Sequence, residues 1–209
     1  MLLIGQFDSP FVRRVAIALH HYGFIYEHRP WSVWAQAEEV AKFNPLRRVP
    51  ILVLDDGEVL VESWAILDAL DEIAADERRL LPRSGAVRRA GLRVSALATG
   101  LADKAVSLLY ERVLRGDGLR SAVWTDRCRA QITATLELLE KERNAAGGPF
   151  WFGTLSHADV AVACALRFVR EAHPGLWTEA GYPSLSAHAE RCEAMPLFQS
   201  AVQALHVAV

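Results

Sequence analysis

The sequence predicts a two-part α/β protein, in which a small domain that mixes strands and helices precedes a larger domain built from helices alone. Two observations support this division. Short apolar runs alternate with helical patterns up to about residue 77, whereas helical spacing of apolar residues dominates from residue 86 onward. A polar segment with Pro82, Ser84 and Gly85 lies between and is typical of a linker. We therefore expect domains at 1–77 and 86–209.

Composition fits an ordinary globular protein, with 209 residues, 52% of them hydrophobic and 23% charged. A net charge of -2 gives no electrostatic footprint for nucleic acid or an anionic membrane. The three cysteines are far apart and form no CxxC pair, which argues against a disulfide framework or zinc site and fits a reducing cytoplasm. The N-terminus lacks the pattern of a signal peptide, and no window approaches 18 uninterrupted apolar residues, so we expect no membrane span.

The first domain begins with an apolar run, 2–7, that predicts a strand. Apolar residues then recur at helical spacing over 11–19, and Gly23 offers a stop. The run 24–28 predicts a second strand, which a right-handed helical crossover would pair in parallel with the first. The less regular stretch 31–43 is expected to hold one short helix.

A hairpin and a helix are predicted to complete this domain. The Asp-Gly pair at 56–57, between the β-rich runs 51–54 and 58–61, is a strong signal for a tight antiparallel hairpin. Ser63 is then expected to cap a helix whose apolar face is formed within 65–70. The resulting order, β-α-β-α-β-β-α, is the layout of a thioredoxin-like domain with a mixed sheet.

The second domain is expected to be all-helical. Long helical patterns run over about 87–114 and 119–144, with glycines between them. Ser156 and Asp159 predict a capping box, with a structural role for the aspartate, at the start of a central helix. Two further helices are predicted to begin at prolines, Pro183 and Pro196.

Ser9-Pro10, directly after the first strand, is the first motif that could carry chemistry. Serine is a preferred helix N-cap and proline a preferred first helical residue. A helix N-terminus presents unpaired N–H groups and a partial positive charge, which would favour a bound thiolate over its thiol. The same pair is also typical of a helix cap without further function, and from these residues alone both interpretations stay open.

The second motif is the segment 44–51, which places Pro50 immediately before an apolar strand. Proline cannot donate to a strand ladder, so it suits a strand start, with a cis bond that turns Val49 outward. The backbone of Val49 could then pair with a short peptide as an added strand. A plain proline between loop and strand explains the same residues.

The third motif, Glu62-Ser63, lies between the hairpin and the next helix. Helix N-terminal amides and the Ser63 hydroxyl suit an α-carboxylate, and Glu62 offers an opposite charge to an ammonium group. The pair would thus match the zwitterionic end of an amino acid. The alternative is an ordinary helix cap beside a solvated acid.

In this order and spacing, the three motifs resemble the N-terminal domain of the glutathione S-transferase superfamily, in its cytosolic, serine-type, bacterial-like form. The resemblance continues into the second domain through 153–159. It implies the glutathione transferase fold, with a thioredoxin-like domain that binds glutathione and a helical domain that contributes the electrophile site. It also implies a cytoplasmic homodimer. The matching segments are 9–15, 44–50 and 61–67.

Residue roles follow from the resemblance, position by position. Ser9 would be catalytic, because it would donate a hydrogen bond to the glutathione sulfur and favour the thiolate. Val49, beside a cis Pro50, would pair its backbone with the cysteinyl unit. Glu62 and Ser63 would hold the γ-glutamyl end.

Two further residues are implied in glutathione binding, Arg48 at the glycine carboxylate and Phe11 in the wall of the cleft. The family commonly has Gly and then Lys or Gln before Val-Pro, whereas this chain has Arg47-Arg48, so the resemblance leaves open how the glycine end of glutathione is held. Dithiol exchange by the protein itself is excluded, because Ser9 and Val12 occupy both cysteine positions of a Cys-Pro-Phe-Cys motif.

The implied function is a glutathione transferase that activates the glutathione thiol for attack on a small hydrophobic electrophile, of the kind used in detoxification, without a metal. Nucleic acid and membranes are not expected partners. The alternative is a transferase-like fold that acts as a non-catalytic binding or interaction protein, since fold does not determine function. Among other polar residues, the pair Arg13-Arg14 is expected to form a solvated face or to pack its side-chain stems on the surface. His188 and Cys192 share one helix face but lack further candidate ligands.

Overall fold

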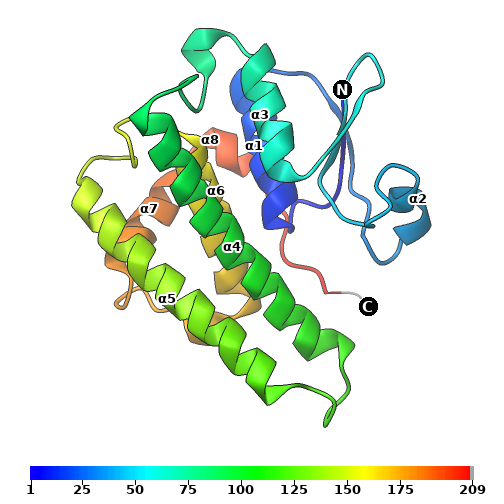
Figure 1. Ribbon diagram of the computed structural model, residues 1–209, viewed down its shortest axis with the longest axis vertical. Coiled ribbons are helices and arrows are strands. Elements are labelled where there is room, and N and C mark those ends of the chain that lie inside the picture. Colours follow the sequence, from blue (N-terminus) through cyan, green and yellow to red (C-terminus); the bar gives the residue numbers. More distant parts are fainter. Residues whose placement is uncertain (208–209) are drawn as a thin grey trace. The chain divides into compact units, whose positions relative to one another are not determined.

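The computed structural model describes residues 1–207, which form two compact units (Figure 1). The first unit holds Met1–Leu80 together with residues 195–207, and the second holds Leu81–Ala194. The sequence pattern predicted that everything after residue 86 belongs to the second domain, so the structure differs there. Buried hydrogen bonds between the first helix and the C-terminal residues, described below, account for the difference.

A four-stranded mixed sheet with the order β2-β1-β3-β4 forms the centre of the first unit. β1 pairs in parallel with β2 and antiparallel with β3, and β3 pairs antiparallel with β4, which confirms the predicted crossover and hairpin. The second strand begins later than predicted, because the N–H of Phe24 still donates to Leu19 at the end of the preceding helix. The strands are β1 (Leu2–Ile4), β2 (Glu27–Arg29), β3 (Ile51–Val53) and β4 (Val59–Val61).

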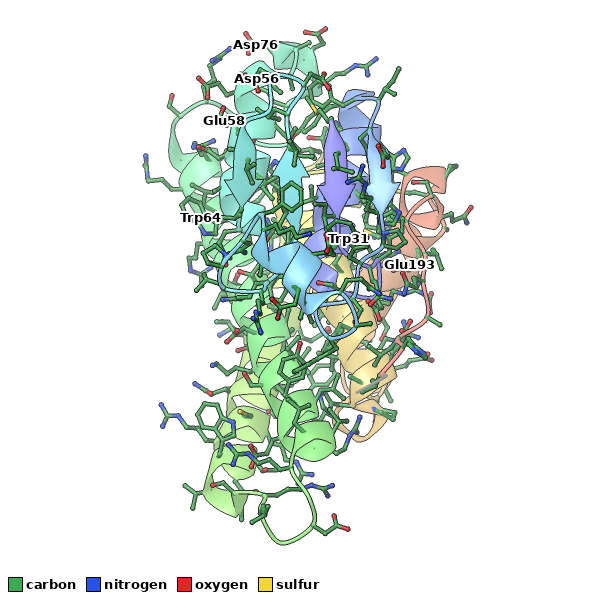
Figure 2. The ribbon with its side chains drawn as sticks, turned by 90° about the vertical axis from the view of Figure 1, so that its right-hand side faces the viewer. Trp31, Asp56, Glu58, Trp64, Asp76 and Glu193 are labelled. Atoms are coloured by element: carbon green, nitrogen blue, oxygen red, sulfur yellow. The ribbon has the colours of Figure 1, made fainter. Side chains whose placement is uncertain are left out.

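Helices cover both faces of this sheet, with α1 and α3 on one side and α2 on the other (Figure 1). On the α2 side, a small apolar cluster of Ile4, Val40 and Ile51 is covered by Trp31 and Phe43. Figure 2 shows Trp31 beside α2, and Asp56 and Glu58 at the β3–β4 turn. The bounds are α1 (Pro10–Tyr22), α2 (Ala37–Ala41), α3 (Ser63–Ile73), a 3-10 turn (Asp76–Arg78) and α8 (Pro196–Gln199).

The second unit is helical, as predicted. α6 is buried along nearly its whole length and packs against α4, which confirms it as the central helix. Ser121 caps α5, so this helix begins three residues after the predicted start. Between residues 1 and 207, no helix has the length and apolar character needed to cross a membrane. The bounds are α4 (Ala86–Leu114), α5 (Ala122–Ala146), α6 (His157–Ala172), a 3-10 turn (Pro174–Leu176) and α7 (Pro183–Glu193).

Candidate functional site

Ser9 is the N-cap of α1, and Pro10 is its first helical residue. The Ser9 Oγ accepts a hydrogen bond from the N–H of Val12 at 3.4 Å, and the Ser9 carbonyl accepts from the N–H of Arg13 at 3.0 Å. The side chain is half-buried. Within the described part of the chain, its hydroxyl donates no hydrogen bond, so the proton is available to an external acceptor.

Gly5, at the end of β1, brings two of the predicted motifs together. Its φ of 128° lies in the region that favours glycine. A Cβ there would lie 2.5 Å from Cγ2 of Val12 and 2.8 Å from Cβ of Val49. The first turn of α1 and the loop before β3 therefore approach the same point of the backbone, and only the missing side chain of Gly5 permits it. In the sequence Gly5 is part of an apolar run, and this role was not predicted.

The peptide bond between Val49 and Pro50 is cis, as predicted from the sequence. Pro50 is buried, and Val49 is half-buried. Among residues 1–207, neither the N–H nor the C=O of Val49 has a hydrogen-bond partner. An extended peptide could therefore pair with this stretch of backbone.

Asn44 shapes the loop that leads into Val49. Its side chain is 3% exposed; Nδ2 donates to the carbonyl of Arg48 at 3.0 Å, and Oδ1 accepts from the N–H of Leu46 at 3.1 Å. The loop is thus held from inside by one buried amide. Asn44 belongs to the second sequence motif, but this function was not predicted, although asparagine commonly makes such turn hydrogen bonds.

Glu62 stands between β4 and α3 with a φ of 68°, which is uncommon outside glycine. It is the residue before α3, and its side chain makes no capping hydrogen bond. Instead its carboxylate lies 3.6 Å from Nη1 of Arg48, and both side chains are about half exposed to solvent. An acid held outside the helix in this way remains accessible to a cation.

Ser63 is not the helix cap that the sequence pattern predicted, because it is the first residue of α3 itself. The positive φ of Glu62 moves the start of the helix one residue earlier. Ser63 is buried, and its Oγ accepts a hydrogen bond from Nη1 of Arg14 at 3.4 Å. This contact ties the first turn of α3 to α1.

The prediction that Arg13 and Arg14 lie at the surface is also wrong, since the two residues are 1% and 4% exposed. Every residue from Val12 to Leu19 is buried, so α1 is covered on all sides there and has no solvated face. Phe11, by contrast, is half-buried in the first turn of α1, two residues after Ser9. The sequence offers one signal for the buried pair, which is its position inside an otherwise apolar helical run.

In the second unit, Ser156 and Asp159 form the predicted capping box at the start of α6. Asp159 is fully buried and accepts hydrogen bonds from the N–H of Trp151 at 2.9 Å, the N–H of Ser156 at 2.9 Å and the Ser156 hydroxyl at 2.6 Å. Burial raises the pKa of this carboxyl, and the hydrogen bonds act in the opposite direction.

His188 and Cys192 are buried beside this carboxylate. Nδ1 of His188 lies 4.0 Å from Oδ1 of Asp159, and burial lowers the pKa of His188 to about 4. The Sγ of Cys192 is 3.6 Å from Nε2 of His188, and burial raises the pKa of this thiol. No three His, Cys, Asp or Glu residues of the described chain form a group that could hold a metal ion.

The sequence of this chain matches a known protein family in both units. Residues 8–73 match the N-terminal domain of glutathione S-transferases, and residues 122–191 match the C-terminal domain. A probable glutathione S-transferase of Oryza sativa subsp. japonica, GSTU1, is 30% identical over 198 residues, which are 92% of this chain and 84% of the relative. The chain belongs to the glutathione S-transferase superfamily.

Other members of the superfamily are similar over comparable lengths. The uncharacterized GST-like protein YibF of Escherichia coli K12 is 30% identical over 177 residues, which are 84% of this chain and 86% of YibF. A glutathione S-transferase of Methylobacterium radiotolerans, solved in complex with glutathione sulfonate, superposes with a TM-score of 0.92 at 29% identity, over 100% of this chain and 97% of that one. A family member from Pseudomonas fluorescens Pf-5 with bound glutathione has a TM-score of 0.85 at 31% identity, over 96% and 97% of the two chains.

These glutathione S-transferases confirm the predicted fold class, a thioredoxin-like domain followed by a helical domain. Glutathione or its sulfonate is bound in both of the solved relatives named above.

Proposed function

We propose that this protein is a glutathione transferase in which Ser9 holds the glutathione sulfur as a thiolate for attack on a small hydrophobic electrophile. The observation that carries the proposal is the state of the Ser9 hydroxyl. It caps α1, is half-buried, and donates to no acceptor between residues 1 and 207. A hydroxyl in this position has a proton to offer to a sulfur anion, and the positive end of the helix dipole supports the same anion.

The glutathione main chain would be held by the two other motifs. The unpaired backbone of Val49 would form strand-like hydrogen bonds with the cysteinyl unit, as in peptide recognition by strand addition. Glu62 would accept the γ-glutamyl ammonium, and the first turn of α3 at Ser63 would bind its α-carboxylate. The proposal assigns Arg48 to the glycine carboxylate and Phe11 to the wall of the cleft.

The energy that thiolate formation requires is within reach of this arrangement. A thiol with a pKa near 8.5 to 9 becomes mainly thiolate at neutral pH when its pKa falls by about two units, which corresponds to about 2.7 kcal/mol. A hydrogen bond to a charged group contributes about 1.5 to 3 kcal/mol, and a helix terminus adds about 0.3 to 1 kcal/mol. Together these two interactions supply the required difference.

In the reaction, the thiolate donates an electron pair to the electrophilic carbon, a sulfur–carbon bond forms, and the leaving group departs with the electrons of its bond. Proximity to the bound electrophile lowers the barrier further. We assign the electrophile site to the helical unit, and we propose a cytoplasmic homodimer. The relatives solved with glutathione sulfonate, from Methylobacterium radiotolerans, and with glutathione, from Pseudomonas fluorescens, support glutathione as the co-substrate.

The test compares wild type with Ser9→Ala, using a panel of small activated aryl halides and glutathione. We expect turnover to fall about 10- to 100-fold, because a charge-assisted hydrogen bond of about 1.5 to 3 kcal/mol is lost from the thiolate. Glutathione affinity is expected to stay within about threefold, since most main-chain contacts remain.

Ser84→Ala is the matched control, because Ser84 is exposed in the segment that leads into α4 and its loss is expected to change nothing. Equal turnover in wild type and Ser9→Ala would contradict the assigned role of Ser9. Glutathione binding without turnover of any electrophile, in wild type and variant alike, would instead favour the non-catalytic alternative.

A further inference from the structure

Hydrogen bonds join the segment that carries Ser9 to the C-terminal segment, defined here as residues 198–206. On the N-terminal side of Ser9, the N–H of Phe7 donates to Oε1 of Gln203 at 3.0 Å, and the N–H of His206 donates to Oδ2 of Asp8 at 3.1 Å. On the other side of Ser9, Arg13 donates to two carbonyls of the same segment. The C-terminal segment is therefore anchored both before and after Ser9.

The contacts before Ser9 act on the stretch that links β1 to α1, which is held at its start by hydrogen bonds of Gly5 with Arg29 and His28. Residues 5–8 lie outside strand and helix. The Phe7 ring stacks on His28, with ring centroids 3.9 Å apart and planes 2° from parallel, and the Phe7 N–H is held by Gln203. The Ser9 N–H donates to the carbonyl of Gln6 at 3.2 Å. Gln203 thus holds the backbone two residues before the N-cap.

Asp8 directly precedes Ser9, so its carboxylate is the acidic group nearest in sequence to the residue that would hold the thiolate. Burial raises its pKa, whereas the N–H groups of His206 and Ser9 lower it. A carboxylate that moved toward the sulfur would raise the pKa of the thiol, because like charges oppose each other. The hydrogen bond from His206 fixes where this charge lies.

The contacts after Ser9 are deeply buried. Arg13 is 1% exposed; Nε donates to the carbonyl of Ala201 at 2.8 Å, and Nη2 donates to that of Phe198 at 3.1 Å. Its guanidinium also lies 5.8 Å from the centroid of the Phe198 ring. A buried charge needs such partners, so the first turn of α1 and the C-terminal segment are held as one piece.

We propose that the C-terminal segment is a positioning element for Ser9, in which Gln203 acts through the Phe7 backbone and the His206 N–H acts through the Asp8 carboxylate. The inference rests on the proposed function of Ser9 and extends it to residues outside both family matches, which end at residues 73 and 191. A hydrogen bond weakens steeply when its distance or angle is poor. The position of the N-cap backbone therefore determines the strength of the hydrogen bond from the Ser9 hydroxyl to the sulfur.

The experiment measures the pKa of the glutathione thiol in the protein complex, by ultraviolet thiolate absorbance against pH, and kcat and KM with an aryl halide. Gln203→Met removes the acceptor for the Phe7 N–H and keeps the side-chain length. His206→Pro removes the N–H that binds Asp8. We expect each variant to raise the thiol pKa and to lower kcat at neutral pH about two- to tenfold, with KM for glutathione within about twofold.

Matched controls separate positioning from general loss of stability. Gln36→Met makes the same chemical change outside the C-terminal segment, because Oε1 of Gln36 accepts from the N–H of Ser32 at 2.8 Å, and His206→Ala keeps the backbone N–H that His206→Pro lacks. We expect both controls to leave the thiol pKa and kcat at wild-type values. A change in thermal stability without a change in the thiol pKa would overturn the proposal, as would equal effects of His206→Pro and His206→Ala.

Ser9→Ala, measured in parallel, distinguishes the two proposals. If Ser9→Ala raises the thiol pKa while Gln203→Met and His206→Pro leave it unchanged, the positioning role is wrong and the function of Ser9 stands. If Ser9→Ala itself leaves the thiol pKa unchanged, the proposed function is wrong, and the role of the C-terminal segment falls with it.

Discussion

Ser9 caps α1 in the first unit and Ser156 caps α6 in the second, and the hydroxyls of these two serines differ in their hydrogen bonds. Ser156 is 5% exposed, and its hydroxyl donates to Asp159 at 2.6 Å. Ser9 is half-buried, and its Oγ only accepts, from the N–H of Val12 at 3.4 Å. The residue three positions after the cap explains the difference, since it is an aspartate in α6 and a valine in α1. With an acid at that position, the proton of the serine is used inside the protein, whereas without one it is available to a ligand.

Because of this difference, mutations near the two serines are expected to affect different properties of the protein. Changes around Ser156 are expected to act on stability, because its partners are buried and mutually satisfied. Changes around Ser9 are expected to act on glutathione chemistry, because its hydrogen-bonding capacity is only partly used.

Asp159→Ala is expected to cost about 3 to 5 kcal/mol in the free energy of unfolding of the unit that contains it. It leaves two buried N–H groups and the Ser156 hydroxyl without their acceptor. Urea denaturation measures the loss. Ser9→Ala, the equivalent loss of a cap interaction in α1, is expected to cost only about 1 kcal/mol. Similar losses for the two variants would break the contrast between the two caps.

Gly5→Ala is expected to destabilise the first unit by about 2 to 4 kcal/mol and to weaken glutathione binding, because its Cβ would collide with Val12 and Val49. Urea denaturation and glutathione titration measure the two effects. Gly57→Ala is the matched control, since Gly57 also has a positive φ, of 91°, but a Cβ added there would meet no atom within 4 Å. Gly57→Ala is expected to cost about 1 kcal/mol and to leave binding unchanged. Equal effects of the two variants would show that backbone strain alone matters at Gly5.

His188 is expected to make the stability of the second unit depend on pH. Burial lowers its pKa from 6.5 to about 4, so between these values the unfolded chain takes up a proton that the folded one does not. This contribution to stability is complete above pH 6.5 and is lost as the pH falls toward 4, by about 3 kcal/mol in all.

His188→Gln removes the titrating group, so thermal melts of the variant between pH 7 and 4 are expected to show a shallower decline than those of wild type. Asp159 titrates in both proteins, and the comparison therefore isolates the histidine. Parallel declines would mean that His188 has the same pKa in the folded and the unfolded protein.

Glu62→Gln is expected to change stability by less than about 0.5 kcal/mol, because its ion pair with Arg48 is exposed. Glutathione affinity is expected to fall about tenfold, since a charged partner of the γ-glutamyl ammonium is lost. Calorimetric titration with glutathione measures this. Glu38→Gln is the control, because Glu38 makes a comparable exposed ion pair with Arg47 at 2.9 Å and has no assigned role in binding. A similar fall in glutathione affinity for Glu38→Gln would show that the effect comes from the net charge of the protein and not from a contact of Glu62 with glutathione.

Local signals in the sequence predicted much of this molecule. The Asp-Gly hairpin, the Ser9 cap, the cis bond before Pro50 and the Ser156–Asp159 capping box each depend on neighbouring residues, so a short stretch of sequence contains the whole pattern. The order of strands and helices followed from the same kind of pattern.

Features that depend on distant residues were not predicted. Arg13 is a charged residue within a helix. Nothing near it in the sequence indicates that its guanidinium donates hydrogen bonds to the carbonyls of residues 198 and 201. The assignment of the C-terminal residues to the first unit depends on the same contacts. Likewise, the role of Gly5 exists only because Val12 and Val49 meet beside it.

The pKa of the glutathione thiol, titrated by its ultraviolet absorbance in complexes with wild type and with Ser9→Ala, tests the central claim most directly. We expect the thiol pKa in the wild-type complex to lie about two units below that of a free thiol, and to rise by at least about one unit in the Ser9→Ala complex. A thiol that titrates at its ordinary pKa in the wild-type complex, or at the same lowered pKa in both complexes, would contradict this claim.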